Sequence, residues 1–373
     1  MSVKMNGYEY IAKTLKGYDV DHVFYVEAMF RMVNKEFGEM GVKRVMAHSE
    51  NAAAYMADGY ARMSGKPAIC MSQSIGAANL AGGIHEAWLA NSPVIAFTGK
   101  KTPEYQYRGS YQEADHRLLY EGITKFNGDV STSAQLPIVL RQCFRAATTG
   151  KPRPVHLDMS NHTGRVIELG SVDKDVYIEP AYKSYPPYRP SAEEGKIKEA
   201  VEAINKAQKP VIVVGRGAMM SEAGAEIYEL AKKGDIAIVT SPDGKALIDE
   251  KDRLWCGIVG SYGMDCANKV VLAADLVIFV GTQTGDQTTF DWNVPSMGTR
   301  TIQIDIDPLE LGKNYPNCTG LWGDAKAVAE QLLENVETKE RPNWINDCRM
   351  LVDKTLKAYE EKQTSDVLPM RPE

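Results

Sequence analysis

The sequence predicts an α/β protein made of two doubly wound domains, each a parallel sheet with helices on both sides. The first observation behind this prediction is that short apolar runs of strand length alternate with segments of helical spacing in both halves of the chain. The second is that small-residue turns follow several of these runs, as at the ligand-binding edge of open α/β sheets. A length of 373 residues suits two domains of ordinary size.

In the first half, strand, small turn and helix follow one another twice. Residues 43–48 predict a strand, and the alanine-rich stretch from Glu50 predicts a helix that stops at Gly65. Residues 68–72 predict a second strand, followed by a turn over residues 72–79 and another helix. These elements come after a predicted helix at 5–17 and a predicted strand at 21–26.

The second half repeats the alternation after a proline-rich stretch. Residues 166–190 predict an extended linker because prolines cluster near its end. A helix is then expected at 191–207, and strands at 211–215, 236–240, 275–281 and 301–306. We therefore divide the chain into a first domain (1–165), the linker (166–190), a central domain (191–340) and a helical tail (341–373).

Composition and charge exclude several classes of protein. A net charge of −6 without a Lys/Arg block argues against a nucleic-acid-binding surface. No apolar run is long enough to span a membrane, and the first twenty residues lack a signal-peptide pattern, so we expect a cytoplasmic protein. Six cysteines and six histidines show no metal-ligand spacing, and no metal site is predicted in this chain.

Glu50 is the first candidate functional residue. Ser49 stands where a helix N-cap belongs, which places Glu50 at a junction of strand and helix. A glutamate in a first turn is also favoured simply by the helix dipole, by up to about 1 kcal/mol. The residues around Glu50 decide whether it is a functional carboxylate or an ordinary first-turn glutamate.

Residues 48–67, H-S-E-N-A-A-A-Y-M-A-D-G-Y-A-R-M-S-G-K-P, closely resemble a stretch of thiamine-diphosphate enzymes of the acetolactate synthase group, with the glutamate in register. Further similar motifs are G-A-A-N (76–79), N-S-P-V-I-A-F-T-G (91–99), G-S-Y-Q-E-A-D (109–115) and K-P-R-P-V-H-L-D (151–158). The resemblance identifies residues 1–165 as the pyrimidine-binding domain of that family.

The resemblance implies a role for Glu50 at the cofactor. The glutamate would form a hydrogen bond with the pyrimidine ring nitrogen and favour the tautomer that activates the thiazolium ring. Gly76 and Asn79 match the turn that borders the cofactor. Ser74 and Ile75 stand where the family more usually has Gly-Pro before Gly76. Glu50 is thus the expected catalytic residue.

Other matched positions point to the rest of the site. Val26 and Glu27 occupy the turn where the family has glycines, which indicates either a harmless loop variant or an altered pocket. Gln112 matches a position near the reacting carbonyl, and His116 is a candidate acid or base, or a structural histidine.

The central domain also resembles that of the family. D-L-V-I-F-V-G (275–281) and Q-I-D-I-D-P-L-E-L-G-K (303–313) match its motifs. The resemblance implies FAD, ADP or no ligand in this domain, with Gly215, Gly217, Gly281 and Asp305 as candidate nucleotide contacts. A nicotinamide dehydrogenase is not favoured, because Met220 stands where the dinucleotide fingerprint needs its third glycine.

The G-D-G motif with a later asparagine, by which the family holds Mg²⁺ and the diphosphate, is not found in this sequence. We therefore expect a split enzyme, in which a separate subunit holds the diphosphate and Mg²⁺ and the pyrimidine domain forms a homo-oligomeric core, as in a heterotetramer. The reaction would be C–C lyase or carboligase chemistry on a 2-oxo acid, diketone or acyl-CoA, with hydrolysis and oxidation left open. The alternative is a non-catalytic nucleotide-binding or regulatory protein derived from the family.

Overall fold

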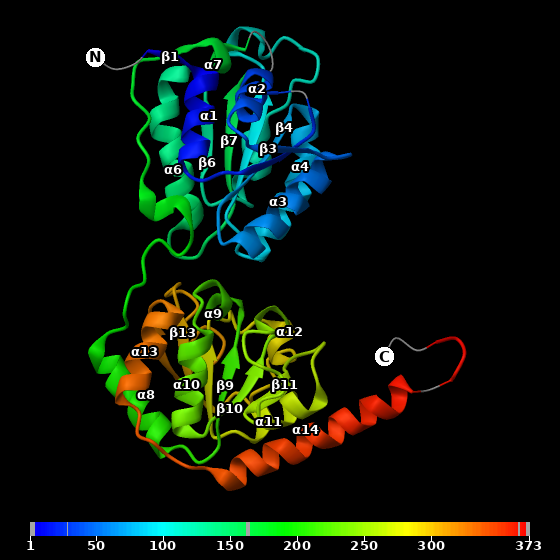
Figure 1. Cartoon of the computed structure of the whole chain (residues 1–373), viewed down its shortest axis with the longest axis vertical. Coiled ribbons are helices and arrows are strands. Elements are labelled where there is room, and N and C mark those ends of the chain that lie inside the picture. Colours follow the sequence, from blue (N-terminus) through cyan, green and yellow to red (C-terminus); the bar gives the residue numbers. More distant parts are fainter. Residues whose placement is uncertain (1–3, 28, 162–164, 365, 371–373) are drawn as a thin grey trace. The chain divides into compact units, whose positions relative to one another are not determined.

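The structure is a computed structural model that describes residues 4–27, 29–161, 165–364 and 366–370. The chain divides into two compact units, Met1–Tyr188 and Arg189–Glu373. Each unit is built on a six-stranded parallel sheet flanked by helices, which confirms the predicted fold class (Figure 1).

The sheet of the first unit has the strand order β3-β2-β4-β5-β7-β6. Its strands are β2 (His22–Tyr25), β3 (Lys43–Met46), β4 (Ala68–Gln73), β5 (Val94–Lys100), β6 (Asn127–Val130) and β7 (Val155–Ser160). Its helices are α1 (Gly7–Gly17), α2 (Arg31–Glu39), α3 (Glu50–Ser64), α4 (Ile75–Leu89), α5 (His116–Glu121), α6 (Leu136–Thr148) and α7 (Val166–Leu169), with short 3₁₀ turns at η1 (Pro103–Tyr105), η2 (Ser133–Gln135) and η3 (Pro180–Lys183).

The two faces of this sheet are covered by different helices. Alternate strand residues point to opposite faces, so Ile69 packs in a core with Ile11 of α1, whereas Cys70 packs in a second core with Leu80 of α4. Helices α1, α2 and α6 contribute to the first core, and α3, α4 and α5 contribute to the second. The second core is rich in alanine, which lets α3 and α4 approach closely.

The strand order reverses direction beside β2. Strand β3 lies on one side of β2 and β4 lies on the other, so the connection from β3 to β4 crosses β2. In open parallel sheets, ligands bind outside the carboxyl ends of the strands at such a point. Helices α3 and α4 both begin at this edge, after β3 and β4 respectively.

The segment that we expected as an extended linker folds onto the first unit instead. Strand β8 (Ser171–Val172) pairs antiparallel with β1 (Met5–Asn6), the one ribbon outside the two large sheets in the described residues. Val172 and Tyr182 are buried in the core of the first unit, and the Tyr185 hydroxyl donates to the Ala61 carbonyl at 2.9 Å. Burial of these apolar side chains outweighs the preference of the prolines for an open segment.

The sheet of the second unit has the strand order β11-β10-β9-β12-β13-β14, again all parallel. Its strands are β9 (Pro210–Val214), β10 (Ala237–Thr240), β11 (Trp255–Ile258), β12 (Leu276–Val280), β13 (Arg300–Asp305) and β14 (Cys318–Trp322). Its helices are α8 (Glu194–Lys206), α9 (Arg216–Met220), α10 (Gly224–Gly234), α11 (Asp265–Ala273), α12 (Asp286–Thr289), α13 (Ala325–Asn335) and α14 (Pro342–Gln363), with a 3₁₀ turn at η4 (Pro242–Gly244). The four strands that we predicted are the inner ones, and the edge strands β11 and β14 were not placed by the apolar pattern.

The first half of α14 belongs to the core of the second unit. Trp344, Cys348 and Val352 are buried in it, and α14 packs against α11. Arg341, just before the helix, is 6% exposed, and its guanidinium donates to backbone carbonyls at the carboxyl ends of two other helices. Its Nη2 lies 2.7 Å from Ile204 O at the end of α8, and its Nη1 donates to Gly234 O at the end of α10.

Replacing Arg341 with alanine is expected to destabilise the second unit by about 3 kcal/mol or more, because several buried carbonyls lose a charged donor at once. Urea unfolding followed by the fluorescence of buried tryptophans such as Trp344 measures this change. The control is Lys354→Ala, which removes an exposed cation from α14 and should change stability by less than about 0.5 kcal/mol. Equal effects of the two substitutions would contradict the capping role of Arg341.

Within the described residues, the structure has no helix with both the length and the apolar character to cross a membrane.

Candidate active site at the edge of the first sheet

Glu50 is the first residue of α3, as the sequence predicted. Ser49 has an extended backbone (φ −149°, ψ 157°), and its hydroxyl accepts a hydrogen bond from the Ala52 amide at 3.2 Å. This cap fixes the start of the helix, because it satisfies one of the amides that has no partner inside the helix. The Glu50 side chain is half-buried at the carboxyl edge of the sheet.

Helix α4 begins earlier than we predicted. The turn that was expected to run to Asn79 ends at Ser74, and Asn79 lies inside the helix. Ser74 has an unusual backbone (φ 48°, ψ −125°), its amide donates to Gly99 O at 2.8 Å, and its buried hydroxyl donates to Gln112 O. These two hydrogen bonds hold a conformation that a non-glycine residue rarely adopts.

Glu50, Gly76 and Asn79 form one contact group. The Asn79 side-chain amide donates to Glu50 Oε2 at 3.2 Å. A Cβ atom at position 76 would lie 2.6 Å from Glu50 Oε1 and 2.5 Å from Ser72 Oγ. The carboxylate therefore occupies the space that any larger residue at position 76 would need, and only glycine leaves it in place.

Close packing of α3 and α4 keeps this group together. A Cβ atom at Gly83 of α4 would lie 2.5 Å from the Cβ of Ala54 on α3, so the two helices touch through small residues. Ala53, Ala57 and Ala77 are fully buried around the same contact. The relative position of Glu50 and Gly76 is therefore fixed by packing and does not depend on a flexible loop.

Gln112 reaches the same edge through its backbone. It is half-buried with a left-handed backbone (φ 55°), and its carbonyl accepts the Ser74 hydrogen bond. The neighbouring Glu113 folds the segment by accepting hydrogen bonds from the amides of Tyr107 and Ser110. Those amide hydrogen bonds, with that of Tyr107 the strongest, lower the pKa of the Glu113 carboxyl.

Val26 and Glu27 follow β2 at the same edge. The Glu27 carboxylate accepts a hydrogen bond from Arg31 Nε at 3.0 Å, and both side chains are exposed. The start of α2 is capped from a distance by Glu168, whose Oε1 accepts from the Met32 amide at 2.8 Å and the Val33 amide at 3.1 Å. The described contacts of Glu27 are thus with α2 and not with the Glu50 group.

His116 is separated from the Glu50 group in a way that the sequence did not indicate. The residue is 1% exposed, and its Nδ1 lies 3.0 Å from Asp158 Oδ1 on β7. Thr98 and His156 continue the same hydrogen-bonded group beneath the surface. Sequence spacing gives no signal for this group, because its members lie on three separate elements.

Of the four central-domain candidates, Gly215, Gly217 and Gly281 contact one another, and Asp305 makes separate contacts. The Gly217 amide donates to Gly281 O at 2.8 Å, and Gly281 has a left-handed backbone (φ 62°). A Cβ atom at Gly215 would lie 2.4 Å from Gly281 O, so protein backbone occupies the space beside these glycines. The Asp305 carboxylate accepts from the Asp307 amide at 2.9 Å. Protein backbone therefore lies directly beside Gly215, Gly217 and Gly281.

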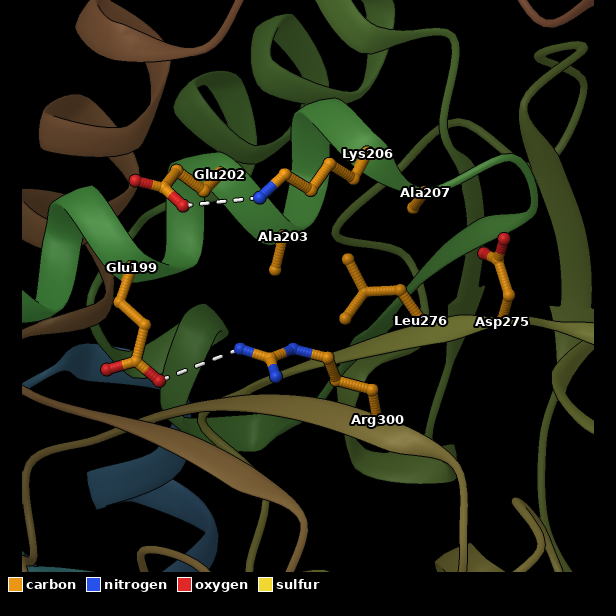
Figure 2. A pocket seen from close by; sticks show the side chains of 8 residues that line it. All are labelled: Glu199, Glu202, Ala203, Lys206, Ala207, Asp275, Leu276 and Arg300. Atoms are coloured by element: carbon orange, nitrogen blue, oxygen red, sulfur yellow. Dashed lines mark hydrogen bonds and ion pairs between the residues drawn. The ribbon is translucent and has the colours of Figure 1, made fainter.

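A cavity of about 440 Å³ lies at the opposite, amino-terminal edge of the central sheet (Figure 2). Its charged side chains are paired: Glu199 with Arg300 at 3.6 Å, and Glu202 with Lys206 at 3.4 Å. Asp275 accepts hydrogen bonds from two backbone amides of the turn after α8. This cavity lies away from the strand ends at which ligands bind in such sheets.

The comparisons with known proteins agree with the two units. Residues 5–119 match the family profile described as "Thiamine pyrophosphate enzyme, N-terminal TPP binding domain", and residues 197–332 match "Thiamine pyrophosphate enzyme, central domain". A probable acetolactate synthase large subunit from Methanocaldococcus jannaschii is 34% identical over 91% of this chain and 58% of its own length. A second, from Methanococcus aeolicus, is 30% identical over 99% of this chain and 63% of its own length. The chain thus spans about three fifths of the length of these relatives.

Proposed function

Because this chain belongs to the thiamine pyrophosphate enzyme family, of which it contains the N-terminal and the central domain, we propose that it is the pyrimidine-binding subunit of a thiamine-diphosphate-dependent enzyme. The observation that carries the proposal is the Glu50 carboxylate, held by Asn79 and seated against Gly76 at the ligand edge of the first sheet. The reaction makes or breaks a C–C bond next to a carbonyl group.

The contact group suits one end of the cofactor. Glu50 is half-buried and one of its oxygens is oriented by Asn79, so the carboxyl group can hold a proton in a hydrogen bond to a ring nitrogen. When bound, thiamine diphosphate supplies the stabilised carbanion that the reaction needs, and the protein supplies orientation and control of protons. Gly76 leaves room for the carboxylate, and Ser74 holds the backbone of Gln112 beside it.

We assign the substrate side of the site to the segment that contains Gln112. Its position, one hydrogen bond from the turn before α4, supports contact with a substrate bound next to the cofactor. The relatives are named acetolactate synthases, which favours a 2-oxo acid substrate and carboligation over a diketone or an acyl-CoA.

The diphosphate needs a second set of residues. It carries several negative charges, which proteins receive with Mg²⁺ held by oxygen ligands or with a free helix N-terminus. The described residues contain no group of three or more His, Cys, Asp or Glu that could hold a metal, and the N-terminus of α3 carries the Glu50 carboxylate. We propose that a separate subunit with a G-D-G motif and a later asparagine supplies these ligands.

We also propose that the first unit forms the homo-oligomeric core of a heterotetramer. Helices α3 and α4 expose large apolar side chains that a monomer would leave in water, namely Met56, Met63, Ile75 and Leu89. Large apolar side chains exposed on one pair of helices support a subunit interface there. A second copy of this domain or the diphosphate-binding subunit would cover them.

Purification of the tagged chain from its native host tests the proposal. We expect a Mg²⁺- and thiamine-diphosphate-dependent activity that fractionates with a protein carrying the G-D-G motif, and that is lost when a chelator removes the metal. The isolated chain should bind the cofactor weakly and turn nothing over. Turnover of a 2-oxo acid by the isolated chain with Mg²⁺ would contradict the two-subunit arrangement.

A further inference from the structure

Beneath the edge of the first sheet lies a chain of five hydrogen-bonding side chains, which we call the buried polar group: Thr98, His116, Asn127, His156 and Asp158. Thr98 is on β5, His156 and Asp158 are on β7, Asn127 begins β6 and His116 begins α5. Four of the five are at most 3% exposed, and Asn127 is half-buried. Buried polar atoms must find partners, so the hydrogens of this group can be counted.

The count starts at Asn127. Its side-chain NH₂ donates to Arg117 O at 2.7 Å, which leaves its Oδ1 as an acceptor 2.8 Å from His156 Nδ1. His156 Nδ1 must therefore carry a hydrogen. Nε2 of the same ring lies 2.6 Å from Thr98 Oγ1, and Thr98 Oγ1 lies 2.8 Å from Asp158 Oδ1.

A neutral His156 beside an ionised Asp158 leaves one of these contacts without a hydrogen. With Nδ1 protonated, a neutral ring offers a bare Nε2, which takes the single hydroxyl hydrogen of Thr98. The contact between Thr98 Oγ1 and Asp158 Oδ1 would then bring two oxygens together with nothing between them. One additional proton completes the chain, and it offsets the charge of the Asp158 carboxylate, which is costly to bury.

The position of that proton follows from the surroundings of His156. Burial, together with the nearby His116 and Lys100, lowers the pKa of His156 well below its usual value, so this ring stays neutral. The extra hydrogen then lies between Asp158 and Thr98. The ring of Tyr120 stacks on that of His156 with 3.8 Å between the ring centroids, which keeps the neutral ring in an apolar contact.

The group is connected to the candidate active site through α5. His116 begins this helix, four residues after Gln112, and Asp158 is the one hydrogen-bond partner of its ring among the described residues, since Nε2 has none. Tyr120, one turn later, donates to Ala77 O at 2.7 Å in the first turn of α4, next to Gly76. His116 thus fixes α5 against β7, and Tyr120 fixes the same helix against α4.

We propose that Asp158 is a buried, protonated carboxylic acid. Through its contact with Asp158, His116 is a positioning residue for the segment that runs from Gln112 to the start of α5. The role of Gln112 rests on the proposed function, whereas the proton on Asp158 does not. The two can therefore fail separately.

Substitution of Asp158 tests the proton directly. In Asp158→Asn, the new NH₂ group can donate to both Thr98 and His116, and it replaces the hydrogen that the protonated acid gives to Thr98. This variant should therefore unfold at the wild-type temperature. Asp158→Ala removes the donor to Thr98 Oγ1 and the described partner of the His116 ring, and it should lower Tm by roughly 2–8 °C. Thr98→Val should lower Tm by a similar amount to Asp158→Ala. Thr98→Ser keeps the hydroxyl group and should have the wild-type Tm.

Nitrogen-15 NMR of the full chain gives a second readout, with the six histidines assigned by single substitutions. We expect His156 to be neutral with its hydrogen on Nδ1, and His116 to change its ring tautomer in Asp158→Asn. Amide hydrogen exchange should become faster at residues 109–121 in Thr98→Val and stay at the wild-type rate in Asp158→Asn. A doubly protonated His156, or a fall in Tm of Asp158→Asn equal to that of Asp158→Ala, would overturn the proposal.

Discussion

Glu50→Gln is expected to lower the turnover of the assembled enzyme by about 10²-fold or more while the cofactor still binds. Glutamine keeps the size of the side chain and can still accept from Asn79, whose amide lies 3.2 Å from Glu50 Oε2. It cannot give or take a proton at that position. Steady-state kinetics at saturating cofactor, with binding followed separately by calorimetry, measures the two effects.

The matched control is Glu194→Gln. Glu194 is likewise the first residue of a helix, α8, but its exposed carboxylate pairs with Lys198 on the same helix surface. This substitution should leave turnover unchanged. If Glu50→Gln and Glu194→Gln gave the same activity, Glu50 would be an ordinary first-turn glutamate.

Gly76→Ala is expected to lower kcat/KM by about 10²-fold without unfolding the protein. The new methyl group would lie 2.6 Å from Glu50 Oε1, so the carboxylate must move, and displacements of about 1 Å at a catalytic group can have effects of this size. The atoms that the methyl group meets are the ends of two side chains, which can rotate away, so Tm should change little. Activity and thermal unfolding are measured on the same preparation.

Gly195→Ala is the control for this substitution. Gly195 is the second residue of α8, as Gly76 is of α4, and a Cβ atom there would meet Glu193 Oε1 at an ordinary 3.6 Å. Activity should be unchanged and stability equal or slightly higher, because alanine favours the helix over glycine. Equal activities of Gly76→Ala and wild type would show that the Glu50 carboxylate does not need its present position.

Local signals explain what the sequence predicted correctly. Three signals depend only on residues close together in the sequence: the Ser49 cap, the alanine spacing of α3 and the apolar runs of the inner strands. Together they place Glu50 at the sheet edge. Ser74 and Gln112 are 38 residues apart, so their hydrogen bond could not be anticipated from either neighbourhood. The early start of α4 was missed for a related reason, since long-range hydrogen bonds hold Ser74 in its unusual backbone.

Contacts between distant segments could not be predicted from the sequence. His116 and Asp158 meet across 42 residues, and only the strand order of the sheet brings them together. Residues 166–188 looked like a linker by composition, but their apolar side chains complete the core of the first unit. In the central domain, the small size of Gly215 and Gly217 lets two backbone turns touch, and the nucleotide site suggested there stays a prediction.

The central claim is that Glu50 recognises a ring nitrogen of the cofactor, and a double-mutant cycle tests it most directly. The affinities of thiamine diphosphate and of an analogue with CH in place of that nitrogen are measured on the assembled wild-type enzyme and on Glu50→Ala. We expect the wild type to prefer the natural cofactor by roughly 10- to 100-fold, as a hydrogen bond to a charged or acidic group provides, and Glu50→Ala to bind both compounds equally. An equal preference in the two proteins would contradict the account.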